Sequence, residues 1–312
     1  MPCGWAGKLA AANSELFNAW FLIPAGVLLL IPSQHQAGLL VWPFMIRLQN
    51  VRKSYDNGAS LAVADTSFTV EKGELLGLIG ESGCGKTTTL KMINRLEEPS
   101  SGSIYIAERD ILSGKPEELR RNIGYVFQGI GLFPHYTVAE NVAAVPVLLN
   151  WTPERIRERC EQVLDMVGLP YAEYGERIPS QLSGGQQQRI GVARALAAEP
   201  DVVLMDEPFG ALDPITRAEL QEEFKRIQHQ LDLTVIMVTH DMTEALLMAD
   251  KIAVMKDGEI LQIGTPYELL NKPQHDYVQK IVDMPKRRAD RLKGLLDQDQ
   301  ENSNNHGQHT DP

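Results

Sequence analysis

The spacing of apolar and polar residues after position 44 predicts an α/β fold. Alternating apolar positions over 46–51 and 61–70 predict two strands that each bury one face. The next segment, 75–80, is apolar or glycine throughout and leads through a glycine-rich turn into a helical pattern over 88–96. We therefore expect a strand, a loop and a helix in that order, which is the local context that a phosphate-binding loop requires.

Two later runs, 202–205 and 235–238, are wholly apolar, and each follows a helical stretch. Strands that are buried on both faces of a parallel sheet have this pattern, so the runs predict a mainly parallel core sheet. The segment from about 133 to 180 shows helical periodicity over 154–167. We expect an inserted helical subdomain there.

The two ends of the chain differ in composition from residues 45–282, which we take as the working domain. Residues 1–44 carry only two charges and contain an apolar run of twelve residues, 20–31, which Pro24 interrupts and which is too short to cross about 30 Å of hydrocarbon. Because Met45 opens the first alternating strand, we expect translation to begin there and residues 1–44 to be an artefact of start-site assignment. The polar residues 283–312 predict a short helix followed by disorder.

Charge and cysteine usage narrow the function. The chain has 41 acidic and 30 basic side chains and a formal charge of -11, so its field repels polyanions and we expect no nucleic-acid partner. Its three cysteines are odd in number and widely spaced, which is typical of a reducing compartment and not of a disulfide framework.

The glycine-rich turn fits the pattern G-x-x-x-x-G-K-[ST] without a mismatch. Its glycines let the backbone N–H groups point inward, and the positive N-terminal end of the following helix adds to the attraction for phosphate. We expect Lys86 to reach the β- and γ-phosphates, Thr87 to offer its hydroxyl to Mg²⁺ and Thr88 to lie near the α-phosphate. The nucleotide-binding residues predicted here are Gly80, Glu81, Ser82, Gly83, Cys84, Gly85, Lys86, Thr87 and Thr88. Cys84 lies inside the loop, and we expect its alkylation to block nucleotide binding sterically.

The apolar run 202–205 ends in two acids, Asp206 and Glu207. Carboxylates at the C-terminal end of a strand lie where open α/β sheets bind their ligands. We expect Asp206 to ligate Mg²⁺, directly or through a water, and Glu207 to polarise the attacking water.

A second candidate for anion binding is the sequence Leu-Ser-Gly-Gly-Gln, whose last four residues are Ser183, Gly184, Gly185 and Gln186. It combines a serine hydroxyl, two glycines that permit close approach of a backbone, and the start of a helical pattern over 187–196. Two phosphate-binding segments and one nucleotide per chain favour a dimer.

The phosphate loop, the Leu-Ser-Gly-Gly-Gln segment and the Asp-Glu strand, in this order and spacing, resemble an ATP-binding cassette (ABC) ATPase over essentially all of residues 45–282. The resemblance implies a mainly parallel core sheet, an antiparallel β subdomain and an inserted α-helical subdomain, with ATP and Mg²⁺ as cofactors. It also implies that two cassettes close head to tail, with each ATP held between the phosphate loop of one subunit and Ser183–Gln186 of the other.

The same resemblance implies roles for four further residues. Tyr55 matches the aromatic residue that stacks on adenine, and Gln128 matches a glutamine that touches Mg²⁺ and the attacking water. Asp213 matches a loop that crosses the dimer seam, although Gly210 stands where many members have serine, which puts one seam hydrogen bond in doubt. His240 matches the histidine that contacts the γ-phosphate, so the catalytic set is Glu207, His240 and Gln128.

Residues 130–135, 138–142, 145–151 and 208–217 resemble the cassettes of bacterial importers for glycine betaine, choline or carnitine. This resemblance implies an integral-membrane permease as partner, a separate solute-binding protein and a peripheral location on the cytoplasmic face of the plasma membrane. The segment 128–141 resembles the groove that accepts a helix of the permease. The alternatives are a soluble ABC ATPase without a transport role and an importer ATPase for another small solute.

Overall fold

A computed structural model describes residues 44–56, 58–129 and 131–306, with only the backbone described at 288, 292 and 294–306. Residues 1–43 lie outside these ranges, and with them nearly all of the segment 1–44 that we expect to be a start-site artefact. Within them, ten strands form one sheet in the order β5-β4-β1-β2-β10-β9-β3-β8-β7-β6. The strands are β1 (Phe44–Lys53), β2 (Val63–Glu71), β3 (Leu75–Ile79), β4 (Ser101–Ile106), β5 (Arg109–Asp110), β6 (Ile123–Val126), β7 (Val202–Asp206), β8 (Thr234–Thr239), β9 (Lys251–Lys256) and β10 (Glu259–Gly264).

The sheet has a parallel half and an antiparallel half, as the sequence predicts. Strands β9, β3, β8, β7 and β6 pair in parallel, whereas β5, β4, β1 and β2 pair antiparallel. The two halves meet at β10, which pairs in parallel with β2 and antiparallel with β9.

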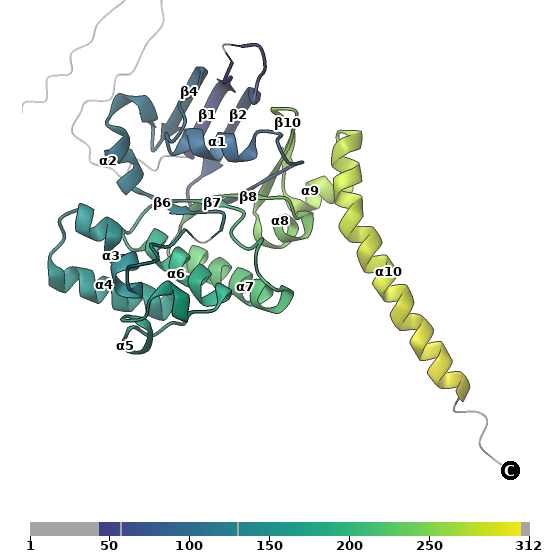
Figure 1. The fold of residues 1–312 in the computed structure, drawn as a ribbon. Coiled ribbons are helices and arrows are strands. Elements are labelled where there is room, and N and C mark those ends of the chain that lie inside the picture. The colour runs from purple at the N-terminus through teal and green to yellow at the C-terminus, as the bar shows by residue number, and fades with distance from the viewer. Residues whose placement is uncertain (1–43, 57, 130, 307–312) are drawn as a thin grey trace, which may run out of the picture. The chain divides into compact units, whose positions relative to one another are not determined.

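Helices cover the sheet and fill the connections between its strands (Figure 1). They are α1 (Lys86–Ile93), α2 (Pro116–Arg121), α3 (Val138–Leu148), α4 (Pro153–Met166), α5 (Tyr171–Tyr174), α6 (Gly184–Leu196), α7 (Pro214–Gln230), α8 (Met242–Met248), α9 (Pro266–Asn271) and α10 (Asp276–His306), with 3₁₀ turns at Ile111–Ser113 and Pro179–Gln181. Helices α3, α4 and α5 lie within the segment where we expect a helical subdomain, and α3 and α4 pack against each other and against α6.

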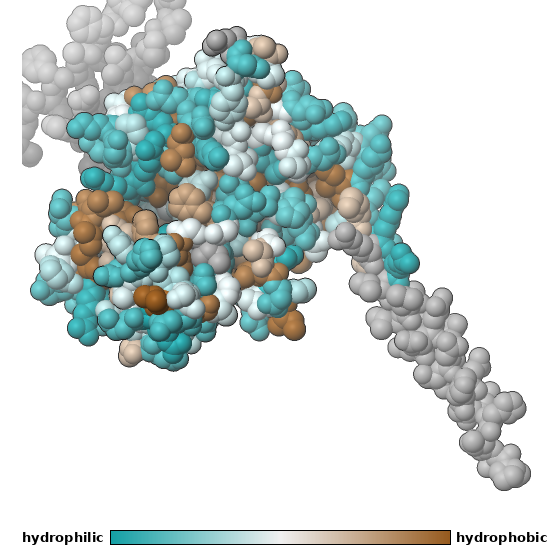
Figure 2. All heavy atoms as spheres, in the orientation of Figure 1, coloured by the Kyte–Doolittle hydropathy of each residue, from teal (hydrophilic) through white to brown (hydrophobic). Residues whose placement is uncertain are grey.

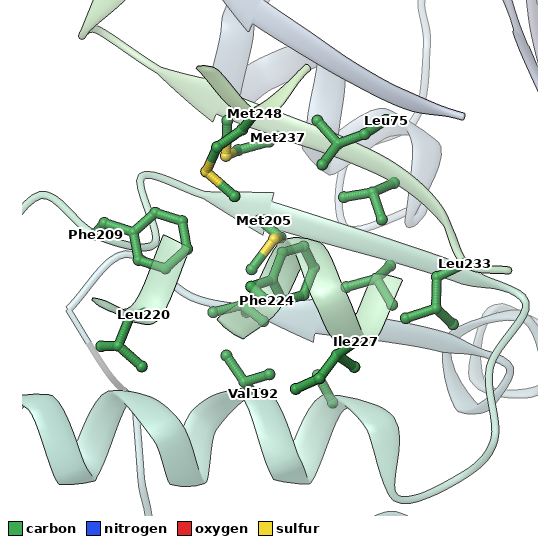
Figure 3. Close-up of a cluster of buried hydrophobic side chains, with 14 of the residues drawn as sticks. Leu75, Val192, Met205, Phe209, Leu220, Phe224, Ile227, Leu233, Met237 and Met248 are labelled. Atoms are coloured by element: carbon green, nitrogen blue, oxygen red, sulfur yellow. The ribbon is translucent and has the colours of Figure 1, made fainter. Parts of the chain in front are cut away.

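The wholly apolar strands divide their side chains between two cores. In β7, Val203 and Met205 join the cluster formed with α6 and α7, whereas Val202 and Leu204 join the cluster formed with α1 and the antiparallel strands. Figure 3 shows Met205 facing Phe224 of α7, with Val192 of α6 beyond it. Burial on both faces explains why alternate positions of this strand are not polar.

The C-terminal segment differs from the expected short helix. A single helix, α10, runs for 31 residues from Asp276 to His306, through Pro285 and across the expected boundary at 283. Its first turns are held by the body of the protein, since Val278 and Val282 are buried and Lys286 Nζ donates to the carbonyl of Leu270 at 2.8 Å. Polar composition led to the expectation of disorder, but it is compatible with a helix once the N-terminal turns are anchored by packing. Over the described ranges, the helices lack the combination of length and apolar character that crossing a membrane demands.

Candidate nucleotide site

The site lies at the C-terminal ends of four adjacent strands. In the sheet these strands stand in the order β3, β8, β7 and β6, and the segments that follow them carry the phosphate loop, His240, Glu207 and Gln128 respectively. The register keeps the strand ends level, because Ile79 pairs with Thr239, Asp206 with Val238, and Val126 with Met205. Four segments that are far apart in the sequence therefore meet at one edge of the sheet.

Glycine is required at two positions of the phosphate loop. A Cβ at Gly80 would lie 2.1 Å from the carbonyl oxygen of Met255, and a Cβ at Gly85 would lie 2.4 Å from that of Ala62. Gly85 also has a φ of 104°, in the region that L-residues avoid. At these two positions the loop is packed against β9 and against the residue before β2 with no space for a side chain, which fixes its curvature there.

Helix α1 presents an uncapped N-terminus to the loop. Its N-cap is Gly85, which has no side chain to accept a hydrogen bond. The first N–H groups of a helix have no partner inside the helix, so here they are open to an anion. Lys86, the first helical residue, is buried, and its Nζ donates to the carbonyls of Gly80 and Glu81 at 2.8 Å each. The ammonium group is thereby held inside the curve of the loop.

The predicted metal ligands Thr87 and Asp206 lie side by side. The Thr87 hydroxyl donates to Asp206 Oδ1 at 2.9 Å, joining the start of α1 to the end of β7. Mg²⁺ commonly binds to one or two protein oxygens together with phosphate oxygens, and a hydroxyl beside a carboxylate fits that requirement. Within the described ranges, Gln128 has no hydrogen bond to either residue, so its predicted role as a metal ligand stays a prediction.

Burial governs the protonation of Asp206. Its carboxyl is 5% exposed, and this desolvation raises its pKa, while the hydrogen bond from Thr87 lowers it and the neighbouring charge of Glu207 raises it further. A bound cation would reverse the effect of burial, because it favours the charged carboxylate. The position is therefore suited to a cation.

The three predicted catalytic residues converge on one carboxylate oxygen. Gln128 Nε2 donates to Glu207 Oε2 at 3.1 Å, and His240 Nδ1 lies 3.3 Å from the same oxygen. Glu207 itself has a φ of 46°, and its N–H donates to the carbonyl of Val238 at 2.9 Å. A positive φ is uncommon for a residue other than glycine, so the backbone of Glu207 is strained at the point where β7 ends.

The Ser183–Gln186 segment forms the N-terminus of α6. The Ser183 hydroxyl accepts from the N–H of Gln186 at 3.2 Å, and the Gln186 side chain accepts from the N–H of Ser183 at 3.0 Å. A Cβ added to Gly184 would meet no atom within 4 Å, so the backbone there is open to an approaching group. In the part of the chain that the structure covers, no hydrogen bond joins this segment to residues 80–88 of the same chain.

Asp213 and Tyr55 both occupy exposed positions. Asp213 caps α7, accepting from the N–H groups of Ile215 and Thr216, and these hydrogen bonds lower its pKa. Tyr55 follows β1 and is 60% exposed, with Lys53 Nζ 4.8 Å from the centre of its ring. An exposed ring is available for stacking on a base. The predicted contact of Tyr55 with adenine stays a prediction.

Two residues that sequence reasoning did not assign border the site. Arg217 of α7 donates to the carbonyls of the loop that follows Glu207. Tyr277 of α10 lines a cavity of about 440 Å³ together with Gly80, Ser82 and His240. Arg217 is the last residue of the segment 208–217, whose resemblance to importer cassettes gave it no role of its own, and a tyrosine about 195 positions after the phosphate loop carries no local signal.

Comparison with known proteins supports the reading of these motifs. The family model described as ABC transporter matches residues 63–210. Carnitine transport ATP-binding protein OpuCA of Listeria monocytogenes is 54% identical over 238 residues, which are 76% of this chain and 59% of that protein. Glycine betaine uptake system ATP-binding protein YehX of Escherichia coli is 50% identical over 237 residues, which are 76% of each protein.

A solved structure agrees with the fold. The ATP-binding cassette MJ0796, in a dimeric post-hydrolysis state bound to ADP and Pi, superposes with a TM-score of 0.64 and 35% identity, covering 71% of this chain and 99% of that one. The chain spans about three-fifths of the length of several curated relatives that it matches. Because it is 50% identical to YehX over 76% of each protein, the chain belongs to the ABC transporter family of ATP-binding proteins.

Proposed function

We propose that this chain is the ATP-hydrolysing subunit of an importer that takes up a quaternary-amine osmoprotectant of the glycine betaine, choline or carnitine type. The observation that carries the chemistry is the convergence of Gln128 and His240 on Glu207 Oε2, beside the Thr87–Asp206 pair. The names of the relatives, which include carnitine, choline and glycine betaine transport proteins, support the solute class.

Different residues of the site bind the phosphates, hold the metal ion and polarise the attacking water. The N-terminus of α1 and Lys86 bind the phosphates, and Thr87 and Asp206 hold Mg²⁺, which when bound offsets phosphate charge. Glu207 accepts a hydrogen bond from the attacking water and polarises it. Gln128 and His240 hold the carboxylate in place, and His240, whose side chain is 64% exposed, is free to contact a terminal phosphate.

We propose that two copies close head to tail around ATP. The Ser183–Gln186 segment makes no hydrogen bond to its own phosphate loop within the described ranges, while its backbone at Gly184 is open. Asp213 belongs to the same surface, because a Cβ at Gly185 would lie only 2.6 Å from Thr216 Cγ2 in the first turn of α7. A surface of this kind is completed by the phosphate loop of a second copy.

The permease is proposed to dock on an apolar surface around α3. Figure 2 shows hydrophobic residues gathered in this region, at the left of the view. The exposed large side chains there are Phe127, Phe133, Tyr136, Val147 and Leu148. Apolar side chains in such number on one surface indicate a protein contact. The subunit would then lie on the cytoplasmic face of the plasma membrane as a peripheral partner, with a separate solute-binding protein delivering the cargo to the permease.

The docking segment is tied to the catalytic group. Asn141 is fully buried and its side chain bonds both the N–H and the carbonyl of Phe133, at 2.8 and 3.1 Å. Arg194 of α6 donates to the carbonyl of Gly131 at 2.8 Å. Because Gln128 begins this segment and bonds Glu207, a movement of the docked permease would be transmitted to the catalytic carboxylate.

The hydrolytic role is tested by Glu207→Gln in the purified protein. The amide does not polarise water as a carboxylate does, so we expect kcat to fall by about 100-fold, about 3 kcal/mol in the barrier, while ATP binding is retained and a closed dimer accumulates. Steady-state hydrolysis and size-exclusion chromatography with ATP measure the two effects. Near-normal turnover of Glu207→Gln would remove the residue from its proposed role.

The solute is tested in the cell that encodes the chain. Deleting the gene should lower the accumulation of labelled glycine betaine, choline or carnitine at high osmolarity, with restoration by the wild-type gene but not by the Glu207→Gln gene. Unchanged uptake of all three solutes, with ATPase activity present in the purified chain, would contradict the solute class and favour another cargo or a role outside transport.

A further inference from the structure

Arg217 joins two loops that are separate in sequence. Located in the first turn of α7, its Nη2 donates to the carbonyls of Leu212 at 3.0 Å and Gly210 at 3.4 Å. Its Nη1 lies 4.0 Å from Asp241 Oδ2. One guanidinium thus contacts both the loop that follows Glu207 and the residue that follows His240.

The two loops carry the groups that meet at the catalytic carboxylate. Glu207 precedes the first loop by three residues, and its Oε2 is 3.3 Å from His240 Nδ1 at the start of the second. Arg217, Glu207, Gly210, His240 and Asp241 also line one small cavity, so the arginine borders the same space as the catalytic pair. The arginine is therefore close enough to set the relative position of the two catalytic side chains without touching the reacting atoms.

The first loop has two backbone hydrogen bonds of its own, because the N–H groups of Gly210 and Leu212 donate to the carbonyls of Glu207 and Phe209, both at 3.3 Å. Gly210 has no side chain and so restricts its own backbone less than any other residue would. Phe209 anchors the preceding position, being 1% exposed in the core. Arg217 holds the carbonyls of Gly210 and Leu212, whose N–H groups are the ones used inside the loop, and the side chain of Leu212 is only partly buried.

The second loop is held at a defined place by its own hydrogen bonds. Asp241 Oδ1 accepts from the N–H groups of Thr243 and Glu244 at the start of α8, and its N–H donates to the Thr239 hydroxyl at 3.0 Å. Asp241 is thus a fixed point to which Arg217 can attach the first loop. A planar guanidinium, with several donors in fixed directions, suits this task in a way that an ammonium does not.

We propose that Arg217 is a positioning residue for hydrolysis. It fixes the Gly210–Leu212 loop to Asp241 and so maintains the relative positions of the Glu207 and His240 side chains. The proposal rests on the proposed role of Glu207 in ATP hydrolysis. Because the same loop leads to Asp213, at the proposed dimer seam, the contact also links closure of the seam to the catalytic pair.

The test compares Arg217→Gln with Arg226→Gln in the full-length chain. Arg226 lies on the same helix, and its side chain is 71% exposed, so it is a matched control. We expect Arg217→Gln to lower kcat about tenfold, the scale of a small misplacement of catalytic groups, while the Kd for ATP stays within about twofold. Arg226→Gln should retain wild-type kcat and Kd.

The variant Arg217→Lys keeps the positive charge but not the planar guanidinium with its several donors. Its kcat is therefore expected to lie between those of wild type and Arg217→Gln. If Arg217→Gln does not fold, the lysine variant is judged by the same split between kcat and Kd. A kcat within twofold of wild type, or a loss of ATP affinity that matches the loss of kcat, would overturn the proposal. Glu207→Gln, measured in parallel, separates this outcome from failure of the proposed function, because Glu207→Gln would then still be inactive.

Discussion

At the residue scale, the phosphate loop places Gly80, where a side chain would not fit, beside Cys84, whose thiol can react. Cys84 lies within the loop, 6% exposed, with its Sγ 3.9 Å from Lys86 Nζ. A Cβ at Gly80 would approach this sulfur to 2.7 Å, so the thiol fills space that the glycine leaves. Any group added to the sulfur must therefore displace the loop or project into the phosphate-binding space.

This geometry predicts how Cys84 reacts. Burial raises the pKa of its thiol, and the nearby Lys86 charge lowers it only in part. Since the thiolate is the nucleophile, iodoacetamide should modify Cys84 slowly at pH 7.5 and faster as the pH rises above the usual thiol range. Peptide mass spectrometry measures the modification.

The modified protein should lose ATP binding, whereas a Cys84→Ser variant treated in the same way should keep it. Full ATPase activity after stoichiometric modification at Cys84 would contradict the steric argument. Rapid modification at neutral pH would contradict the burial of the thiol.

At the element scale, four helices begin in segments that carry predicted site residues, and their caps differ. Helix α1 is capped by glycine, α6 by Ser183, α7 by Asp213 and α8 by Asp241. The side-chain caps satisfy N–H groups that α1 leaves open, and α1 is the helix that follows the phosphate loop. The absence of a capping side chain at Gly85 is thus part of the binding site.

Ser183 is expected to act both as a cap and as a seam contact. Ser183→Arg removes the hydroxyl and places a long side chain where the partner's phosphate loop would approach, so we expect ATP hydrolysis to be lost. Loss of the cap alone should cost about 1 kcal/mol of stability. Hydrolysis and thermal unfolding measure the two effects separately.

Thr265→Ala is the matched control, because Thr265 and Glu268 form the same reciprocal cap at the start of α9. It should show a similar loss of stability with hydrolysis retained. Wild-type hydrolysis by Ser183→Arg would argue against a site shared between two copies.

At the scale of the whole molecule, the sheet organises two cores, and buried polar groups link the elements around it. Glu244 of α8 is 7% exposed and accepts from Gln221 of α7 at 2.8 Å. Burial raises the pKa of its carboxyl, against the lowering effect of its hydrogen bonds to Thr239 and Gln221. A raised pKa means that folding favours the protonated form, so this contribution to stability is complete below the unfolded pKa and is lost as the pH rises through the folded value.

Glu244→Gln should therefore stabilise the protein at pH 7.5, above the usual range of a glutamate, because the amide carries no charge that burial would penalise. The amide oxygen still accepts from Gln221, and we expect the midpoint of thermal unfolding to rise by about 2–4 °C. The gain should disappear as the pH approaches the usual range of a glutamate. Glu222→Gln, an exposed position on α7, should change the midpoint little at either pH. A lower midpoint for Glu244→Gln at pH 7.5 would show that the charge is stabilising.

The sequence alone predicts the features that depend on neighbouring residues. The pattern of glycines around Lys86 identifies the phosphate loop because a tight turn with positive φ is a local property. The apolar runs 202–205 and 235–238 identify β7 and β8 because burial on both faces excludes polar residues at every position. The end of α1 at Ile93 was misjudged by three residues, since Arg95 adopts a φ of 50° that no motif marks.

Only the tertiary structure decides which of these features meet. Gln128, Glu207 and His240 follow β6, β7 and β8, and their convergence depends on those strands being neighbours in the sheet, which strand patterns do not reveal. The contacts of Arg217 with Gly210 and Asp241, and the long anchored helix α10, have the same origin. Local sequence patterns indicate which helix, strand or turn a segment can form. Strand order and packing determine which distant side chains come within hydrogen-bonding distance.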